Sequence, residues 1–521
     1  MASRLEEIRT QKINKLEQLK EHYDPFEFEK YKRDMSAEDF RKKYESLKDQ
    51  EKKEEMVSLA GRIISVRGHG KLQFMDLKDQ NGELQVVFRK DDIENFDIVK
   101  FISIGDIVGV KGHPMRTRAG ELSVQVKEFL ILSKNIMPLP EKWHGLQDPE
   151  LKYRKRYVDF IMDDESRKAI IIRSQIIKEM RDILNKKGFL EIETPMLHSI
   201  VGGANAKPFM THHNALDIPL NLRIAPELHL KRLIVGGFEK VYEIGRQFRN
   251  EGIDFKHNPE FTTMELYWAY ADYEDVMDIT EELLHEISNR VIGKEEIEYE
   301  GKTISLKRPW KRISMNDAVK AETGIDFSKL SNEEALELAR KHNVELPYDG
   351  SRGKILVEFF DKYVEDKLIA PTFITKYPVE VSPLAKRDPK DKTVTNRFEL
   401  FINGWEFANA FSELNDPFDQ YERFKKQVEL KDLGDEEAND MDYDFIEALE
   451  TGLPPTGGLG IGIDRFAMLL SNKHSIRDVL AFPLLRPEIS DLQKILDPDS
   501  IPKKESKKDK GKKKEGKKEE K

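Results

Sequence analysis

The sequence predicts an α+β fold in more than one domain, and three observations support this. Its 521 residues exceed the usual size of a single domain. Short β-rich runs separated by glycine turns occupy residues 56–135 and predict a small β-barrel. The longer remainder combines an amphipathic helix over 165–187 with two hairpins. We therefore expect a barrel followed by a larger domain of helices and strands.

Composition excludes several classes of protein. The chain has no cysteine, which excludes disulfides, a thiol nucleophile and cysteine-ligated metal sites. No run approaches 18 apolar residues and the N-terminus lacks the apolar stretch of a signal peptide, so we expect a cytoplasmic protein with no membrane partner. The formal net charge is −10, although residues 503–521 hold 11 lysines against five acidic residues. Because the rest of the chain is strongly acidic, any contact with nucleic acid must use local basic patches.

Shifts in composition divide the chain into segments. They are a charged helical extension (1–55), an OB-fold barrel (56–135), a proline-containing linker (136–160), the large domain (161–495) with a mostly helical insertion (316–380), and a disordered lysine-rich tail (496–521). Leucines at helical spacing in the extension are typical of a solvated amphipathic helix, and a helix that contacts RNA is the alternative. The barrel strands are expected at 57–66, 71–77, 84–88, 107–111 and 122–129. An OB-fold binds single-stranded nucleic acid by stacking and hydrogen-bonding its bases, and Phe74 and Gln85 are candidates for these contacts.

The large domain begins with a helix and a first hairpin. The helix over 165–187 has one apolar stripe, formed by Ile172, Ile176, Met180 and Ile183. Gly188 should end it, and a strand at 189–193 should end at Pro195. Hairpin strands over 241–251 and 261–270 then present one surface bearing Arg249, Glu251, Phe261, Glu265 and Tyr267, with His257 in the connecting loop. A salt-bridged, solvent-facing sheet is the alternative.

A second hairpin is predicted at Asn403-Gly404, the strongest two-residue turn signal. Its register sets Phe401 opposite Glu406, so that Glu399 lies diagonal to Glu406 on the same face. Two such carboxylates can hold Mg²⁺ together with phosphate oxygens, and a surface carboxylate pair is the alternative. In a regular strand, Glu406 would point to the opposite face from the later Asn409 and Glu413. A common site therefore requires a bulge near 407–408.

A glycine-rich strand runs into a helix at 457–470. We expect Asp464 to cap this helix and Arg465 to lie in its first turn, which together form a good phosphate site. A dinucleotide-binding fingerprint would need a glycine where Arg465 stands, and the P-loop pattern is absent from the sequence.

Together these features resemble the three motifs of class II aminoacyl-tRNA synthetases. The motifs are a helix–strand ending in Pro195, Phe-Arg-Asn-Glu at 248–251, and a glycine-rich strand–helix ending in Asp464-Arg465. With an OB-fold before them, the order is similar to that of the lysyl, aspartyl and asparaginyl subgroup. Further stretches resemble the lysyl members in particular: 143–148, 202–204, 225–228, 257–262, 264–267 and 409–416. The resemblance covers about residues 56–490.

The resemblance implies an activity and assigns residues to it. Its lysyl members activate L-lysine with ATP, release pyrophosphate, and transfer lysine to the 3′ end of tRNA(Lys). Motif matching implies an ATP site of Arg249, Glu251, His257, Phe261 and Arg465, in which Arg249 and Arg465 are catalytic, and a Mg²⁺ pair of Glu399 and Glu406. It implies a lysine site of Gly203, Glu227, Arg249, Glu265, Tyr267, Asn409 and Glu413, and anticodon contacts by Phe74, Gln85, Arg67 and Glu121. The first motif implies a homodimer with an antiparallel sheet flanked by helices.

Three alternatives remain open from the sequence. An aspartyl- or asparaginyl-type synthetase shares the motifs, but its pocket would need hydrogen-bond donors where Glu413 stands. A noncatalytic RNA-binding protein would be expected to lose the phosphate or metal ligands, which are present here. A lysyl-transferase that acts on a protein would resemble the catalytic domain alone, without the barrel.

The lysine-rich tail is either an arm that tethers tRNA nonspecifically or a segment without function. Each lysine that neutralises a phosphate releases counterions, which steepens the salt dependence of binding. If the tail is a tethering arm, deleting residues 503–521 should weaken tRNA binding and reduce the slope of log K against log salt concentration. An unchanged slope in a titration series would exclude this role.

Overall fold

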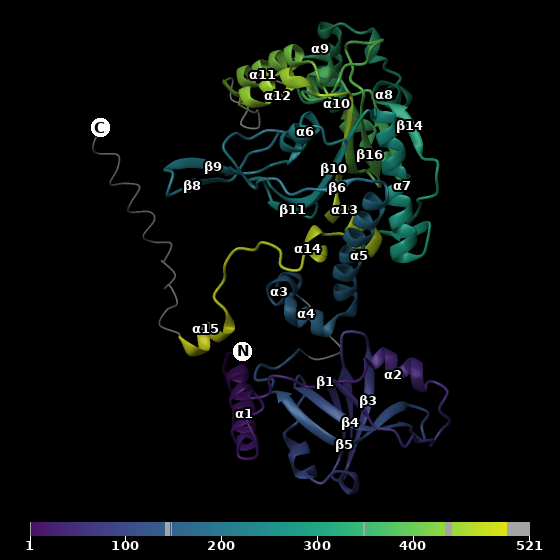
Figure 1. The fold of residues 1–521 in the computed structure, drawn as a ribbon, viewed down its shortest axis with the longest axis vertical. Helices are drawn as coiled ribbons and strands as arrows, with labels where there is room; N and C mark the ends of the chain where they lie inside the picture. Colours follow the sequence, from purple (N-terminus) through teal and green to yellow (C-terminus); the bar gives the residue numbers. More distant parts are fainter. Residues whose placement is uncertain (1, 141–145, 147, 347–349, 433–439, 498–521) are drawn as a thin grey trace, which may run out of the picture. The chain divides into compact units, whose positions relative to one another are not determined.

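The computed structural model describes residues 2–140, 146, 148–346, 350–432 and 440–497 (Figure 1). The lysine-rich tail beyond residue 497 and most of the 143–148 stretch therefore lie outside the described residues. The chain forms two compact units, of which the larger is Leu146–Leu485. The smaller is Met1–Gly145 together with the residues from Arg486, of which 486–495 were expected in the large domain. They group with the smaller unit because α15 (Asp491–Leu496) contacts α1 (Ala2–Lys20).

The smaller unit contains the predicted barrel. Its elements after α1 are α2 (Ala37–Tyr44), β1 (Val57–His69), β2 (Leu72–Lys78), β3 (Glu83–Arg89), β4 (Ile107–Arg116) and β5 (Leu122–Ser133). The strands close in the order β1-β2-β3-β5-β4, which confirms the five predicted strands. The extension is not simply a solvated helix, because Leu16 and Leu19 of α1 are buried and Lys12 Nζ donates to Ile104 O at 3.3 Å.

The larger unit contains an eight-stranded sheet in the order β14-β15-β16-β17-β18-β11-β10-β6. Its strands are β6 (Leu190–Glu191), β10 (Lys240–Phe248), β11 (Glu260–Ala269), β14 (Lys311–Ser314), β15 (Thr372–Thr375), β16 (Arg397–Ile402), β17 (Trp405–Ser412) and β18 (Thr456–Gly462). All pairs between β15 and β10 are antiparallel, and the two outermost pairs are parallel. The predicted α+β class is therefore confirmed.

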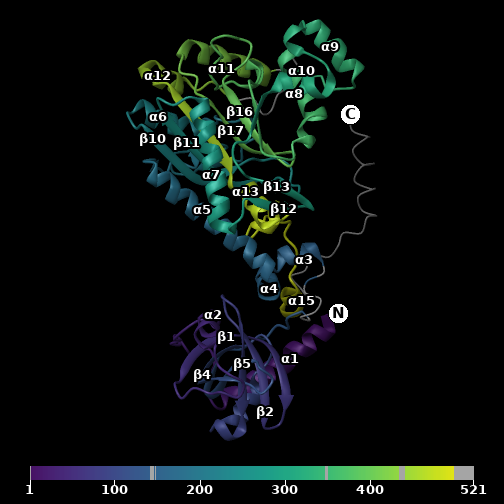
Figure 2. The ribbon, with the colours of Figure 1, turned by 90° about the vertical axis from the view of Figure 1, so that its right-hand side faces the viewer.

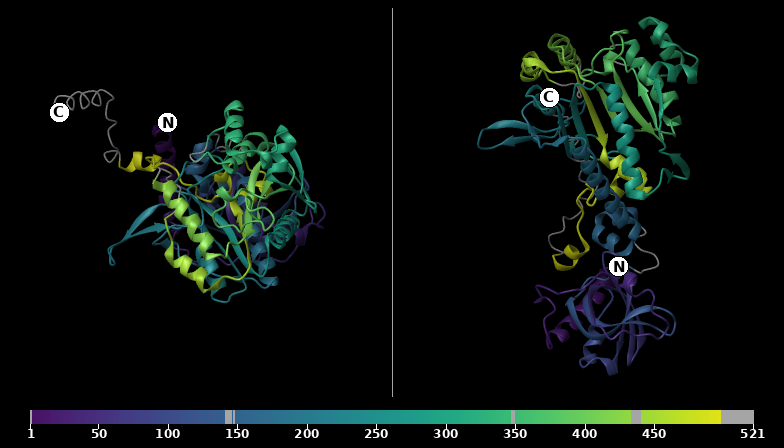
Figure 3. Two further views of the ribbon diagram at one scale, coloured as in Figure 1. Left: turned by 90° about the horizontal axis from the view of Figure 1, so that it is seen from above. Right: turned by 45° about the vertical axis from the view of Figure 1, so that its right-hand side comes forward.

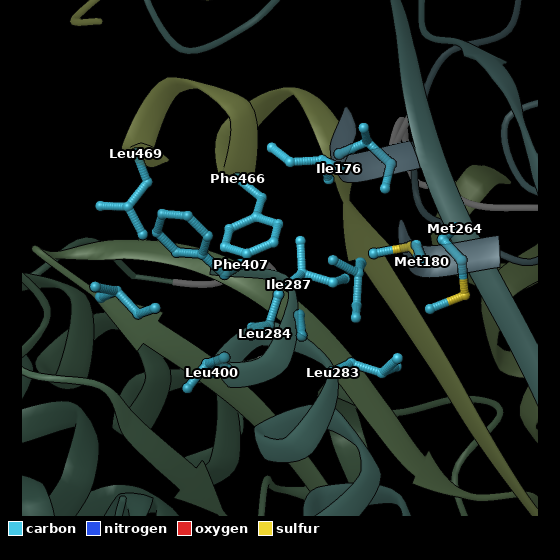
Figure 4. Packing of buried hydrophobic residues seen from close by; sticks show 14 of the residues in the cluster. Ile176, Met180, Met264, Leu283, Leu284, Ile287, Leu400, Phe407, Phe466 and Leu469 are labelled. Atoms are coloured by element: carbon cyan, nitrogen blue, oxygen red, sulfur yellow. The ribbon is translucent and has the colours of Figure 1, made fainter. Parts of the chain in front are cut away.

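Helices pack against both faces of this sheet. The helices of the unit are α3 (Pro149–Arg154), α4 (Arg156–Met162), α5 (Asp164–Lys186), α6 (Glu227–Val235), α7 (Tyr273–Ile292), α8 (Met315–Thr323), α9 (Asn332–Lys341), α10 (Arg352–Tyr363), α11 (Pro417–Asp432), α12 (Tyr443–Gly452), α13 (Ile463–Ser471) and α14 (Ile476–Val479). The main core packs α5, α7 and α13 against the sheet (Figure 2). Figure 4 shows Ile176 and Met180 of α5 beside Met264 of β11 and Phe466 of α13. The stripe predicted on 165–187 is this buried face of α5. Helices α6 and α12 pack on part of the opposite face, around a second core.

The remaining strands lie outside the main sheet. They are β7 (Leu197–His198), β8 (Met210–His213) and β9 (Ile218–Leu222) in one small sheet, and β12 (Glu296–Tyr299) and β13 (Lys302–Ser305) in another. Helices α8, α9 and α10 surround a separate core beside β14 (Figure 3). The insertion expected at 316–380 is therefore mainly helical, but β15 within it belongs to the main sheet. Among the described residues, no helix is long and apolar enough to cross a bilayer.

Candidate active site

A cavity of about 450 Å³ opens on the face of the sheet opposite the main core. Its lining includes all thirteen residues that the sequence analysis assigned to the ATP, lysine and metal sites. These are Gly203, Glu227, Arg249, Glu251, His257, Phe261, Glu265, Tyr267, Glu399, Glu406, Asn409, Glu413 and Arg465. Residues more than 250 positions apart in the chain thus meet in one site.

Strand alternation places the β11 side chains as predicted. Phe261, Glu265 and Tyr267 line the cavity, whereas Met264 and Leu266 between them belong to the main core. The strand predicted over 241–251 is shorter in the structure, where β10 ends at Phe248. Arg249 follows the strand, and its backbone N–H still donates to Pro259 O at 2.9 Å.

The bulge required on β17 is present. Leu400 pairs with Ala408 and Phe401 with Glu406, which leaves Phe407 as the extra residue. Phe407 packs into the core, so Glu406 before it and Asn409 after it both line the cavity. The prediction of a bulge near 407–408 is therefore confirmed.

The carboxylate pair is partly held by neighbouring side chains. Tyr377 Oη donates to Glu399 Oε2 at 2.8 Å, and Arg397 Nη2 donates to Glu399 Oε1 at 2.5 Å. Burial raises the pKa of Glu399 to about 7; the charge of Arg397 opposes the increase and that of Glu406 adds to it. A cation between the two carboxylates would favour their ionised forms.

Two arginines supply positive charge on the same floor. The guanidinium of Arg249 lies 5.1 Å from the ring centre of Phe261, and its buried Nε has no acceptor among the described residues. Arg465 Nη1 donates to Glu406 O at 2.6 Å, and its Nη2 lies 3.4 Å from His257 Nε2. These groups can bind an extended anion.

Arg465 lies in the first turn of α13 as expected, but Asp464 is not the cap. The N-cap position is Gly462, and Asp464 lies inside the helix. Its carboxylate accepts from Thr262 N at 2.7 Å and from Arg173 Nε at 2.9 Å. Asp464 therefore ties α13 to β11 and α5, an arrangement that depends on tertiary contacts rather than on local spacing.

Glu227, Glu265 and Glu413, with the hydroxyl of Tyr267, form what we call the acidic cup. All four side chains are buried, and Glu413 Oε1 has no hydrogen-bond donor among the described residues. Burial, reinforced by Glu227, raises the pKa of Glu265 to about 8, and burial raises that of Glu413 well above its usual range. The cup is suited to a buried cation with several hydrogen-bond donors.

Two glycines make room in the cup. A Cβ at Gly458 would overlap Glu413 Oε1 and lie 2.8 Å from the Tyr267 ring. Gly203 has φ +90°, and a Cβ there would lie 3.0 Å from that of Glu227. Side chains at either position would displace the carboxylates.

Two cationic residues at the site were not predicted from the sequence. Arg397 stands two positions before Glu399 on β16 and therefore shares its face, so strand alternation was a usable signal. Lys231 stands four positions after Glu227, a helical spacing that puts both on one side of α6. Its buried Nζ pairs with Glu227 Oε1 at 2.6 Å and with Glu413 Oε2.

In the barrel, three of the four proposed anticodon residues share one outward face. Arg67 of β1 pairs with Phe74 of β2, and Gln85 of β3 pairs with Asp76, two residues along β2 from Phe74. Arg67 Nη2 forms an ion pair with Asp76 Oδ1 at 2.8 Å, and Gln85 Oε1 accepts a hydrogen bond from Ser123 Oγ at 3.0 Å. Glu121 lies just before β5, 3.7 Å from Arg41 Nη2. The first three residues therefore form a continuous surface, while Glu121 lies at the end of a strand.

The fold and the cavity define a class II aminoacyl-tRNA synthetase. The family described as tRNA synthetases class II (D, K and N) matches residues 148–486, and an OB-fold nucleic acid binding domain of the tRNA anticodon type matches residues 57–132. Lysine–tRNA ligases of Staphylococcus epidermidis and Staphylococcus aureus are each 52% identical, covering 92% of this chain and 98% and 99% of the relatives. That of Thermoanaerobacter pseudethanolicus is 50% identical over 92% of this chain and 96% of its own. The chain belongs to the lysine–tRNA ligase family.

Proposed function

We propose that this protein activates L-lysine with ATP to lysyl-adenylate and pyrophosphate, and then transfers lysine to the 3′ end of tRNA(Lys). The observation that carries the proposal is the buried acidic cup at one end of a cavity that also holds Arg249 and Arg465. A lysine side chain has the charge and the three donors that such a cup requires. A pocket for aspartate or asparagine would need donors in place of Glu413.

The first step requires alignment and charge neutralisation rather than a protein nucleophile. The lysine carboxylate is already ionised and attacks the α-phosphate in line. Arg249 holds the lysine carboxylate and the α-phosphate together, and its buried Nε without an acceptor supports an anionic ligand here. His257 and Arg465, 3.4 Å apart, bind the outer phosphates, while Phe261 stacks on adenine and Glu251 accepts from its amino group.

The acidic cup selects the amino acid. Glu413 and Tyr267 receive the ε-ammonium with Glu265 close by, and Glu227 and the Gly203 carbonyl receive the α-amino group. Asn409, whose Oδ1 accepts from Arg397 Nε at 3.1 Å, completes the wall of the lysine site. Full burial of Glu413 supports this role, because a desolvated ammonium must be paired to offset its transfer from water.

Glu399 and Glu406 would hold Mg²⁺ together with the phosphates of ATP. Two converging carboxylates fit this ion, which proteins bind through one or two carboxylates and substrate oxygens. When bound, Mg²⁺ neutralises charge on the triphosphate.

The proposed assembly and RNA contacts extend beyond the cavity. The outward barrel face of Arg67, Phe74 and Gln85, with Glu121 at its edge, binds the anticodon by stacking and hydrogen bonds. A homodimer forms through the segment that matches the first motif and the residues just after it, where Leu190, Met196 and Leu197 expose apolar side chains. We place the enzyme in the cytoplasm, where tRNA and ATP are available.

Pyrophosphate exchange with each of the twenty amino acids tests this function. We expect exchange that depends on lysine alone and requires Mg²⁺. Exchange with aspartate or asparagine would identify another member of the subgroup, and no exchange with any amino acid would favour a noncatalytic protein. Lysine activation without charging of tRNA would favour transfer to a protein.

The pH dependence of lysine use should follow the buried carboxyl groups. The pKa of Glu265 is raised to about 8 by burial and by Glu227, so this group is largely protonated below that pH in the free enzyme. Binding an ammonium beside it favours loss of the proton, and kcat/KM for lysine should therefore rise between pH 6 and pH 8. Exchange assays across this range at saturating ATP check the prediction, and a flat profile would contradict it.

A further inference from the structure

Lys231 places a second ammonium group at the acidic cup. It lies on α6, is 1% exposed, and contacts Glu227 Oε1 at 2.6 Å and Glu413 Oε2. The rings of Phe411 and Phe445 lie 5.5 and 5.7 Å from its Nζ. The proposed substrate therefore meets carboxylates that already share a cation belonging to the protein.

This cation occupies only one oxygen of each partner. Lys231 binds Oε2 of Glu413 and leaves Oε1 without a donor among the described residues. Lys231 also binds Oε1 of Glu227. The other oxygen, Oε2, points towards Gly203 and would lie 3.7 Å from a Cβ added at that glycine. Both carboxylates are thus bridged on one side and keep their other oxygen available.

The charges of the cup match a diamino acid. When the cup is fully ionised, its three carboxylates and the Lys231 ammonium leave a net charge of −2. Bound lysine carries two ammonium groups, which neutralise that charge, while its carboxylate is paired by Arg249. Without Lys231 the same three carboxylates would retain one uncompensated charge in a buried site, which is strongly unfavourable.

We propose that Lys231 is a positioning residue that determines specificity for lysine, because it bridges Glu227 and Glu413 and matches the charge of the cup to two substrate ammonium groups. The inference rests on the proposed function and extends it to a residue that does not line the cavity.

Ionisation of the cup depends on Lys231 and on the groups around it. Lys231 contacts Glu227 of the same helix, Glu413, and the rings of Phe411 and Phe445. Glu265 and Tyr267 of β11 interact with Glu413, and Arg223 and Arg249 act on Glu265. Burial raises the pKa of Glu413, and Lys231 is the main opposing influence. Burial would lower the pKa of Lys231, but Glu227 and Glu413 more than offset this. Removing the ammonium should therefore raise the pKa of Glu413 further, so that lysine can bind only as a proton leaves.

The test is Lys231→Met, measured by pyrophosphate exchange between pH 6 and pH 9. We expect KM for lysine to rise at least 30-fold at pH 7 and KM for ATP to change less than threefold. The pH at which KM for lysine levels off should move up by at least one unit. Lys231→Arg keeps the charge, so its KM for lysine should level off at the same pH as in the wild type, which we call the pH midpoint.

Arg232→Met is the matched control. It removes the neighbouring cation of α6, which pairs with Asp442 and Asp444 outside the cup, at 3.2 and 2.6 Å. We expect wild-type KM and pH midpoint from this variant. If Lys231→Met does not fold, Lys231→Gln gives the same comparison, because it also removes the charge.

Two outcomes would overturn the inference. One is a wild-type pH midpoint in Lys231→Met, and the other is an equal rise in KM for lysine and ATP, which would indicate a merely structural role. Failure of the wild-type enzyme to exchange pyrophosphate with lysine would instead refute the proposed function.

Discussion

Replacing Glu413 with glutamine should lower kcat/KM for lysine by about 30-fold to several thousandfold in pyrophosphate exchange. Truncating one partner of a buried, hydrogen-bonded charge pair costs about 2–5 kcal/mol, and about 1.4 kcal/mol corresponds to a factor of ten. Glu413 is 1% exposed, so water cannot replace the lost carboxylate. Glutamine keeps the shape and one acceptor oxygen, which isolates the effect of charge.

The loss should fall on lysine and not on the nucleotide. KM for ATP should remain close to wild type, because the groups proposed to bind phosphate lie elsewhere in the cavity. Glu447→Gln is the matched control, since Glu447 is exposed on α12, the helix that packs beside α6. Near-normal lysine activation by Glu413→Gln would refute the assignment of the acidic cup.

Much of the fold was predictable because local patterns and tertiary structure agree. The barrel strands are short β-rich runs separated by glycine turns, so their existence was predictable although several extend further than expected. The bulge at Phe407 was predictable for a different reason. The chemistry required Glu406 and Asn409 on one face, and strand geometry allows that only with an extra residue.

The features that were missed depend on contacts between distant segments. The position of Asp464 suggested a helix cap, but its carboxylate is held by Thr262 and Arg173 from other elements. A buried Lys231 contradicts the usual exposure of lysine, and only the fold brings Glu413 to its ammonium. The grouping of α15 with the barrel unit likewise has no signal in local sequence.

Replacing Arg249 with lysine should lower kcat for pyrophosphate exchange by about 100- to 1,000-fold, the effect expected for a donor aimed at charge that develops in the transition state. Lysine retains the positive charge but loses the planar fork that can bind a carboxylate and a phosphate together. It also loses stacking on Phe261, whose ring centre lies 5.1 Å from the guanidinium. The measurement is exchange at saturating lysine and ATP.

Arg246→Lys provides the comparison that separates this role from a general need for arginine in this hairpin. Arg246 lies three residues earlier, is partly exposed, and pairs with Glu260 at 3.3 Å. Because lysine can keep that surface ion pair, which is worth about 0–1 kcal/mol, Arg246→Lys should exchange pyrophosphate at nearly the wild-type rate. If Arg249→Lys also retained wild-type kcat, a point charge would suffice at this position, and simultaneous binding of carboxylate and α-phosphate by Arg249 would be excluded.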